Sequence, residues 1–197
     1  MDRFELSSPT RVSRMHFVLA WALCVLALLL TTATWLPGPN QVPFAAVGVV
    51  FVAIFPVFGA ALVRALFSEG GRTLLGRANS IGMLQFVRNL STGLKCAYVV
   101  VLAALLLTMA TGGAAQDAKT DGRGGHYCTR WNNTERRCEP VPLTAHEYDE
   151  ATKAQARVFA AGAALFHAMG GFLVLVAASP AAARRAGTGS ERVARMG

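Results

Sequence analysis

Four stretches of this chain contain no charged side chain and are each about 20 residues long or longer: 17–36, 44–63, 96–115 and 158–179. At about 1.5 Å of rise per residue, a helix of about 20 apolar residues spans the roughly 30 Å hydrocarbon core of a bilayer. Lipid offers no hydrogen bonds to the backbone, and a helix satisfies its own peptide groups. We therefore predict an all-α membrane protein with four transmembrane helices.

The composition supports lipid as the solvent of these four stretches. Only 15% of the 197 residues are charged and 53% are hydrophobic, whereas about a quarter of the residues in a soluble domain are charged. The first stretch exceeds the roughly 7–15 apolar residues of a secretory signal core, so we predict that it is a retained helix.

The net charge of +8 is unevenly distributed along the chain. The N-terminal tail, the segment 64–95 and the C-terminal tail carry excess charges of +1, +4 and +3, whereas 116–157 has seven basic and seven acidic residues. Basic residues accumulate on the cytoplasmic side of membrane proteins. The charge therefore predicts a multi-pass cell-membrane protein with both termini cytoplasmic (N-in/C-in), and we expect the bilayer, not nucleic acid, as its partner.

These patterns divide the chain into seven segments. They are a cytoplasmic N-tail (1–15), a transmembrane hairpin of two helices (16–67), a cytoplasmic loop (68–95), a third transmembrane helix (96–115), an extracellular loop (116–156), a fourth transmembrane helix (157–179) and a cytoplasmic basic tail (180–197). Within the cytoplasmic loop, apolar residues at helical spacing predict an amphipathic interfacial helix over 79–94; a partner-binding helix is the alternative.

Two cysteines bracket the polar sequence "HYCTRWNNTERRC" in the predicted extracellular loop. Alternating residues on both sides of an Asn-rich turn predict a β-hairpin, and an oxidising compartment favours a disulfide between Cys128 and Cys138. A metal site that uses these cysteines with His126 and His146 is the alternative. Structural zinc sites usually pair ligands two to four residues apart, so we expect no metal.

A capping box follows the hairpin. Thr144 precedes Glu147 by three residues, and no helix breaker occurs between Ala145 and Ser179. In this motif the threonine oxygen accepts from a free backbone N–H while the glutamate reaches back. We therefore predict that the fourth helix begins in water and that its first dozen residues project on the order of 18 Å from the bilayer.

Few polar groups fall at membrane depth. His167, in "AALFHAMGG", and Thr108 form a candidate intramembrane polar site, and a neutral packing histidine is the alternative. Pro56 predicts a kink in the second helix. A haem held by two histidines is not expected within one chain, because His16 lies at the membrane boundary. We expect no cofactor and no catalytic residue.

The outer loop resembles a family of small bacterial, actinobacterial-like multi-pass membrane proteins of unassigned function. The resemblance rests on Tyr127, Asn132 and Asn133, then "LTAHEYDEA", and then "ARVF" at the start of the last apolar stretch. In that family a Gly-His pair follows the Arg-x-Phe sequence, whereas this chain has "AAGAA". The resemblance implies a helical membrane fold and lends no activity.

These observations predict a non-enzymatic accessory or scaffold protein that binds another membrane or envelope protein, or a second copy of itself. The candidate partner surface in the loop comprises Tyr127, Arg130, Trp131, Arg136 and Arg137. A small oligomeric transporter or channel that uses the kink and His167 is the alternative function. A membrane redox or haem protein is the third.

Overall fold

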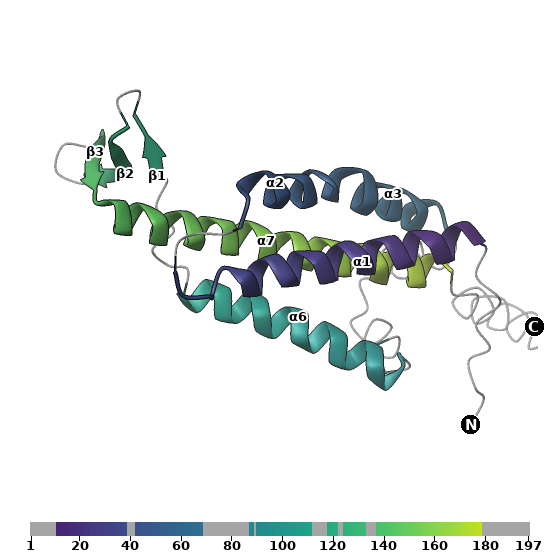
Figure 1. Cartoon of the computed structure of the whole chain (residues 1–197). Helices are drawn as coiled ribbons and strands as arrows, with labels where there is room; N and C mark the ends of the chain where they lie inside the picture. Colours follow the sequence, from purple (N-terminus) through teal and green to yellow (C-terminus); the bar gives the residue numbers. More distant parts are fainter. Residues whose placement is uncertain are drawn as a thin grey trace, which may run out of the picture. The chain divides into compact units, whose positions relative to one another are not determined.

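The computed structural model describes residues 11–38, 42–68, 87–88, 90–111, 118–121, 124–132 and 137–178, without the side chains of 130–132 and 137–138. The elements, in chain order, are α1 (Arg11–Ala33), α2 (Phe44–Val52), α3 (Ile54–Phe67), α6 (Thr92–Thr111), β1 (Ala118–Thr120), β2 (His126–Asn132), β3 (Arg137–Leu143) and α7 (Ala145–Ala177) (Figure 1). Most of the predicted amphipathic helix over 79–94 lies outside the described residues.

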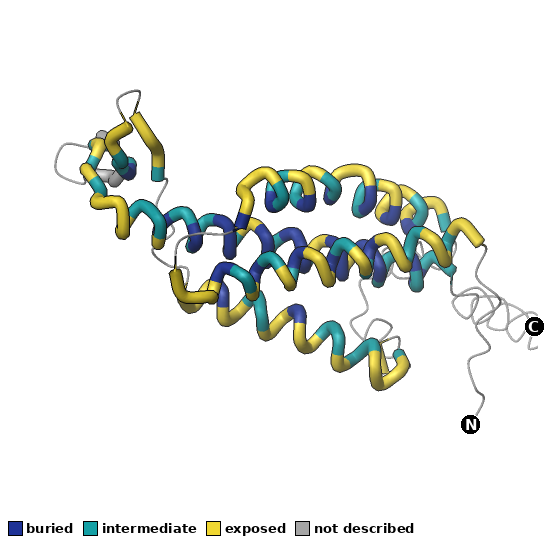
Figure 2. Tube along the Cα trace, viewed as in Figure 1, coloured by how far each residue is buried: buried dark blue, intermediate teal, exposed yellow. Residues whose placement is uncertain are grey.

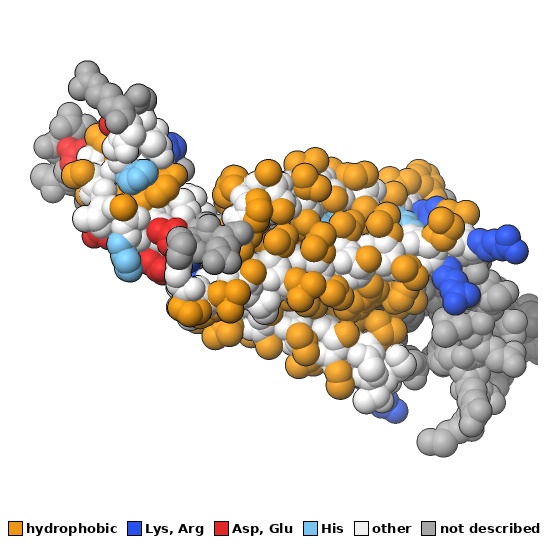
Figure 3. Space-filling view, in the orientation of Figure 1, with side chains coloured by type: hydrophobic (Ala, Val, Ile, Leu, Met, Phe, Trp, Pro, Cys, Tyr) orange, Lys and Arg blue, Asp and Glu red, His pale blue; other side chains and the backbone are white. Residues whose placement is uncertain are grey.

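Among the described residues, four helical segments are long and apolar enough to cross a membrane: α1, α2 together with α3, α6, and α7. They confirm the prediction of four long apolar helices and are compatible with a multi-pass membrane protein. Large apolar side chains are exposed on these helices; Leu106 of α6, for example, is 69% exposed. Figures 2 and 3 show exposed positions and apolar side chains along the helices. Soluble proteins rarely expose such continuous apolar surface, whereas lipid accommodates it.

The second span is interrupted near Pro56, where the sequence predicts a kink. α2 ends at Val52 and α3 begins at Ile54, with Ala53 between them. Proline lacks the N–H that would bond to the carbonyl four residues earlier, and its ring crowds that carbonyl. For Pro56 the affected carbonyl belongs to Val52, the last residue of α2. The helical ladder resumes with the Val57 N–H, which donates to the Ala53 oxygen at 3.2 Å.

The described residues group into two compact units, each built from parts of several helices. The unit that includes the described residues of 1–24, 53–100 and 166–197 contains a cluster of half-buried aromatic side chains. In it, the Trp21 ring lies 5.3 Å from the Tyr98 ring and 6.3 Å from the Phe17 ring, between centroids. The Tyr98 hydroxyl also donates to the Ala168 oxygen at 3.3 Å. Gly171 lets α7 approach Trp21 and Phe17 closely, and Gly170 lies against Phe58 and Ala61 of α3.

The second unit comprises the described residues of 25–52 and 101–165. Its apolar core includes Val42, Val47, Ala156 and Ala160, which join α7 to the start of α2. The unit also contains the three-stranded antiparallel sheet, in the order β1-β2-β3. The predicted hairpin is present as β2 and β3. β1 has no predicted counterpart, because an element of three residues is too short to show alternation.

The structure corrects the prediction of a disulfide between Cys128 and Cys138. Cys128 is a free cysteine and is fully buried. In the β2–β3 ladder Cys128 lies opposite Val141, whereas Cys138 lies opposite Trp131, three residues away along the strand. At about 3.4 Å per residue the two Cα atoms are on the order of 10 Å apart, beyond the roughly 7 Å that a disulfide can bridge. The backbone ladder with its third strand holds the hairpin.

Two glycines of α7 provide a matched test of the packing around Trp21. A Cβ atom on Gly171 would lie 3.0 Å from Trp21 Nε1, whereas a Cβ atom on Gly162 would meet nothing within 4 Å. Alanine at either site gains about 1 kcal/mol of helix propensity, but overpacking costs about 1–3 kcal/mol. We expect Gly162→Ala to raise the thermal unfolding midpoint in detergent and Gly171→Ala to lower it. Equal midpoints for the two variants would contradict this packing.

Candidate functional site: a polar junction on α7

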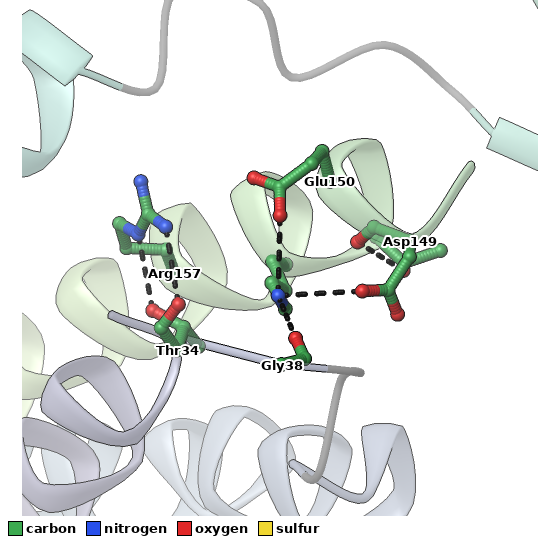
Figure 4. A network of polar contacts seen from close by, with 7 residues as sticks. Thr34, Gly38, Asp149, Glu150 and Arg157 are labelled. Atoms are coloured by element: carbon green, nitrogen blue, oxygen red, sulfur yellow. Dashed lines mark hydrogen bonds and ion pairs between the residues drawn. The ribbon is translucent and has the colours of Figure 1, made fainter. Parts of the chain in front are cut away.

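The first third of α7 is polar, and Arg157 is its last charged residue before the apolar stretch. Arg157 is only 9% exposed. Its Nε donates to Thr34 Oγ1 at 3.0 Å and its Nη2 donates to the Thr34 backbone oxygen at 3.2 Å (Figure 4). The guanidinium carbon also lies 4.0 Å from the centroid of the Trp35 ring. Hydrogen bonds and a cation–π contact thus compensate for the burial of this charge.

Lys153 makes the second connection between α7 and the turn after α1. It is 5% exposed, and its Nζ donates to the Gly38 oxygen (Figure 4). The same Nζ lies 3.1 Å from Glu150 Oε1 and 3.3 Å from Asp149 Oδ2. Gly38 has a φ of +107°, a conformation that glycine adopts without strain. The turn therefore presents the Gly38 carbonyl to α7 because a glycine occupies that position.

The predicted capping box begins α7. The Thr144 N–H donates to Glu147 Oε2 at 2.8 Å, and the Glu147 N–H donates to Thr144 Oγ1 at 3.3 Å. The Thr144 backbone N–H and hydroxyl, which stabilise the charged form, lower the pKa of Glu147 below its usual value. The cap is therefore complete at neutral pH. It weakens only when the pH falls below the usual pKa of a glutamate and Glu147 becomes protonated.

Aromatic and hydroxyl groups join the sheet to α7. The His126 ring of β2 stacks on the Tyr148 ring with centroids 4.0 Å apart and planes 12° apart. The Thr120 hydroxyl of β1 donates to the Tyr148 hydroxyl at 3.2 Å. Two strands therefore contact a single side chain in the first turn of α7. Together with the capping box, these contacts fix the sheet to the beginning of the helix.

The residues of the predicted partner surface are only partly described. Tyr127 is half-buried in β2. Arg130, Trp131 and Arg137 lie in β2 and β3, but their side chains are outside the described part of the structure, and all of Arg136 is outside it.

The predicted intramembrane residues are placed deep in the protein. His167 and Thr108 are both buried, at 0% and 1% exposure, and they belong to different units. The described residues contain no group of three or more His, Cys, Asp or Glu side chains that could hold a metal ion.

Sequence reasoning missed the junction of Arg157 and Lys153 with Thr34, Trp35 and Gly38. The sequence nevertheless contained a signal for this junction. Arg157 immediately precedes one apolar stretch and Trp35 lies at the end of another, so the two residues are expected at similar depths at the membrane boundary. The pairing itself spans more than 120 residues of sequence and has no local pattern.

Comparisons with known proteins assign no relatives: no family model, curated protein or solved structure matches the chain.

Two threonines of α1 and its following turn test the Arg157 contact. Thr34→Val removes the hydroxyl that accepts from Arg157 Nε while keeping the side-chain shape. A lost hydrogen bond to a charged group costs about 1.5–3 kcal/mol, so we expect a clear drop in the free energy of unfolding. Thr32→Val is the matched control, because the Thr32 hydroxyl is exposed and, within the described residues, bonds only to the Leu29 oxygen of the same helix. Equal effects in chemical denaturation would contradict the role of Arg157.

Proposed function

We propose that this chain is a non-enzymatic accessory or scaffold subunit of the cell membrane that presents its β-sheet to a partner protein. In this proposal both termini are cytoplasmic and the sheet is extracellular. The observation that carries the proposal is the fixed attachment of the sheet to α7, a continuous 33-residue helix that continues into the apolar span. A sheet held in this way is a preorganised surface, and preorganisation lowers the entropic cost of binding.

The register of the sheet indicates which face is available to a partner. His126 stacks on α7 and Cys128 is buried, so the face that carries them is turned inward. Because side chains alternate along a strand, the other face carries Lys119, Tyr127, Thr129, Pro140 and Pro142. We call these five residues the outer face. Lys119 and both prolines are exposed.

The outer face combines an aromatic ring with rigid prolines. Lys119, Tyr127 and Pro142 lie side by side on successive strands of the sheet. Aromatic residues are enriched at protein interfaces because they contribute large contact areas at low conformational cost. The prolines of β3, an edge strand, have no N–H to offer an added strand. These features favour recognition through side chains of the outer face over strand addition.

A small oligomeric transporter or channel is the second candidate function. The interrupted second span and the complete burial of His167 favour it. Solute flux through liposomes that contain the purified chain would support this candidate over the scaffold.

Photo-crosslinking tests the scaffold function. We expect benzoylphenylalanine in place of Tyr127 to capture one protein partner in native membranes at native abundance, identified by mass spectrometry. The matched control places it at Phe55, which is 69% exposed on α3 and would face lipid. A second copy of the chain captured at position 127 would make the partner the chain itself. Failure to capture a protein there, or the same capture from both positions, would refute the proposal.

A further inference from the structure

A cavity of about 630 Å³ opens beside the polar beginning of α7. Its wall combines the apolar residues Val141, Leu143 and Ala154 with three charged residues, Glu147, Glu150 and Arg157. Small-molecule sites typically enclose about 300–1,000 Å³ and combine an apolar lining with a few polar groups. This cavity is partly open to its surroundings, and its volume and mixed lining fall within the range of small-molecule sites.

Arg157 provides the positive end of the cavity. Its Nε and Nη2 are used by Thr34, whereas Nη1 makes no hydrogen bond to any residue in the described ranges and is directed away from Thr34 in Figure 4. The guanidinium group is well suited to bind phosphate oxygens. Arg157 also immediately precedes the apolar stretch of α7, and this is the depth at which lipid phosphates meet the hydrocarbon core.

Carboxylates provide the negative end. Glu147, Glu150, Ala154 and Arg157 are spaced by three or four residues and share one face of α7. Along the axis Glu150 precedes Arg157 by roughly 10 Å, at about 1.5 Å per residue. Lys153 forms ion pairs with both Glu150 and Asp149. One lysine cannot neutralise two carboxylates, so these three side chains together keep a net negative charge. The cavity thus changes from positive at the apolar boundary to negative towards the beginning of the helix.

We propose that this cavity binds the headgroup of a zwitterionic phospholipid that carries a primary ammonium group. The phosphate lies at Arg157 Nη1, and the ammonium group donates to the carboxylate of Glu150. The acyl chains continue along the apolar part of α7. This order of charges disfavours an anionic glycerol headgroup, which has no cation for the carboxylate. It also disfavours a choline headgroup, which has no N–H to donate.

Lipid retention by the purified full-length chain tests the proposal. The detergent-solubilised protein is mixed with equal amounts of phosphatidylethanolamine, phosphatidylcholine and phosphatidylglycerol, and bound lipids are counted by native mass spectrometry. We expect phosphatidylethanolamine to exceed each of the others by about fivefold or more, the effect of about one net hydrogen bond. Equal retention of the three lipids would overturn the proposal.

Variants separate the cavity from the stability of the fold. Ala154→Leu fills the cavity without removing a polar contact and should abolish the preference. Ala145→Leu is the matched control, because Ala145 is exposed at the start of α7 and does not line the cavity. Glu150→Gln should reduce the preference for phosphatidylethanolamine over phosphatidylglycerol. Retention by Ala154→Leu equal to that of Ala145→Leu would overturn the proposal.

A further arm of the experiment distinguishes a lipid from free phosphate as the source of the anion. Inorganic phosphate at millimolar concentration is added before the lipids. We expect it to leave the phosphatidylethanolamine preference intact, because the acyl chains and the ammonium group add contacts that free phosphate lacks. Loss of all retained lipid on addition of phosphate would assign the cavity to a soluble phosphate and overturn the lipid proposal.

Discussion

The buried charge of Arg157 is the constraint on which the arrangement of its unit depends. A guanidinium group at the edge of an apolar stretch needs hydrogen-bond acceptors, and Thr34 supplies two of them while Trp35 supplies an aromatic face. These contacts exist only when the turn after α1 lies at one particular position along the axis of α7. Arg157 therefore sets the register of two segments that are far apart in sequence. Lys153 reinforces the same register through Gly38.

The continuity of α7 transmits this register to the sheet. The helix begins at a capping box, carries the stacked Tyr148 in its first turn, and reaches its apolar part after Arg157. Because no break separates these features, the position of the sheet follows from that of the helix. The proposed scaffold function and the proposed lipid site both use this arrangement. The first would use the outer face of the sheet, and the second would use the cavity beside the polar turns.

Local patterns predicted much of this structure, and long-range register accounts for what they missed. The four apolar helices, the Thr144–Glu147 cap and the β2–β3 hairpin are encoded by periodicity and spacing over short windows. The disulfide failed as a prediction because loop length does not reveal that Cys128 pairs with Val141 and not with Cys138. The Arg157–Thr34 contact was missed because its partners are 123 residues apart and no local pattern pairs them.

The depth profile of α7 in a bilayer tests most directly whether this helix passes from water into lipid at Arg157. Single spin labels on the chain in lipid nanodiscs report collisions with a water-soluble relaxation agent and with oxygen. The labels are placed, one at a time, at the exposed positions Glu147, Glu150, Phe159, Phe166 and Met169. The account predicts dominant collisions with the water-soluble agent at 147 and 150, dominant collisions with oxygen at 159, 166 and 169, and a single transition near Arg157. Water-like collision rates at position 166, or lipid-like rates at position 150, would contradict it.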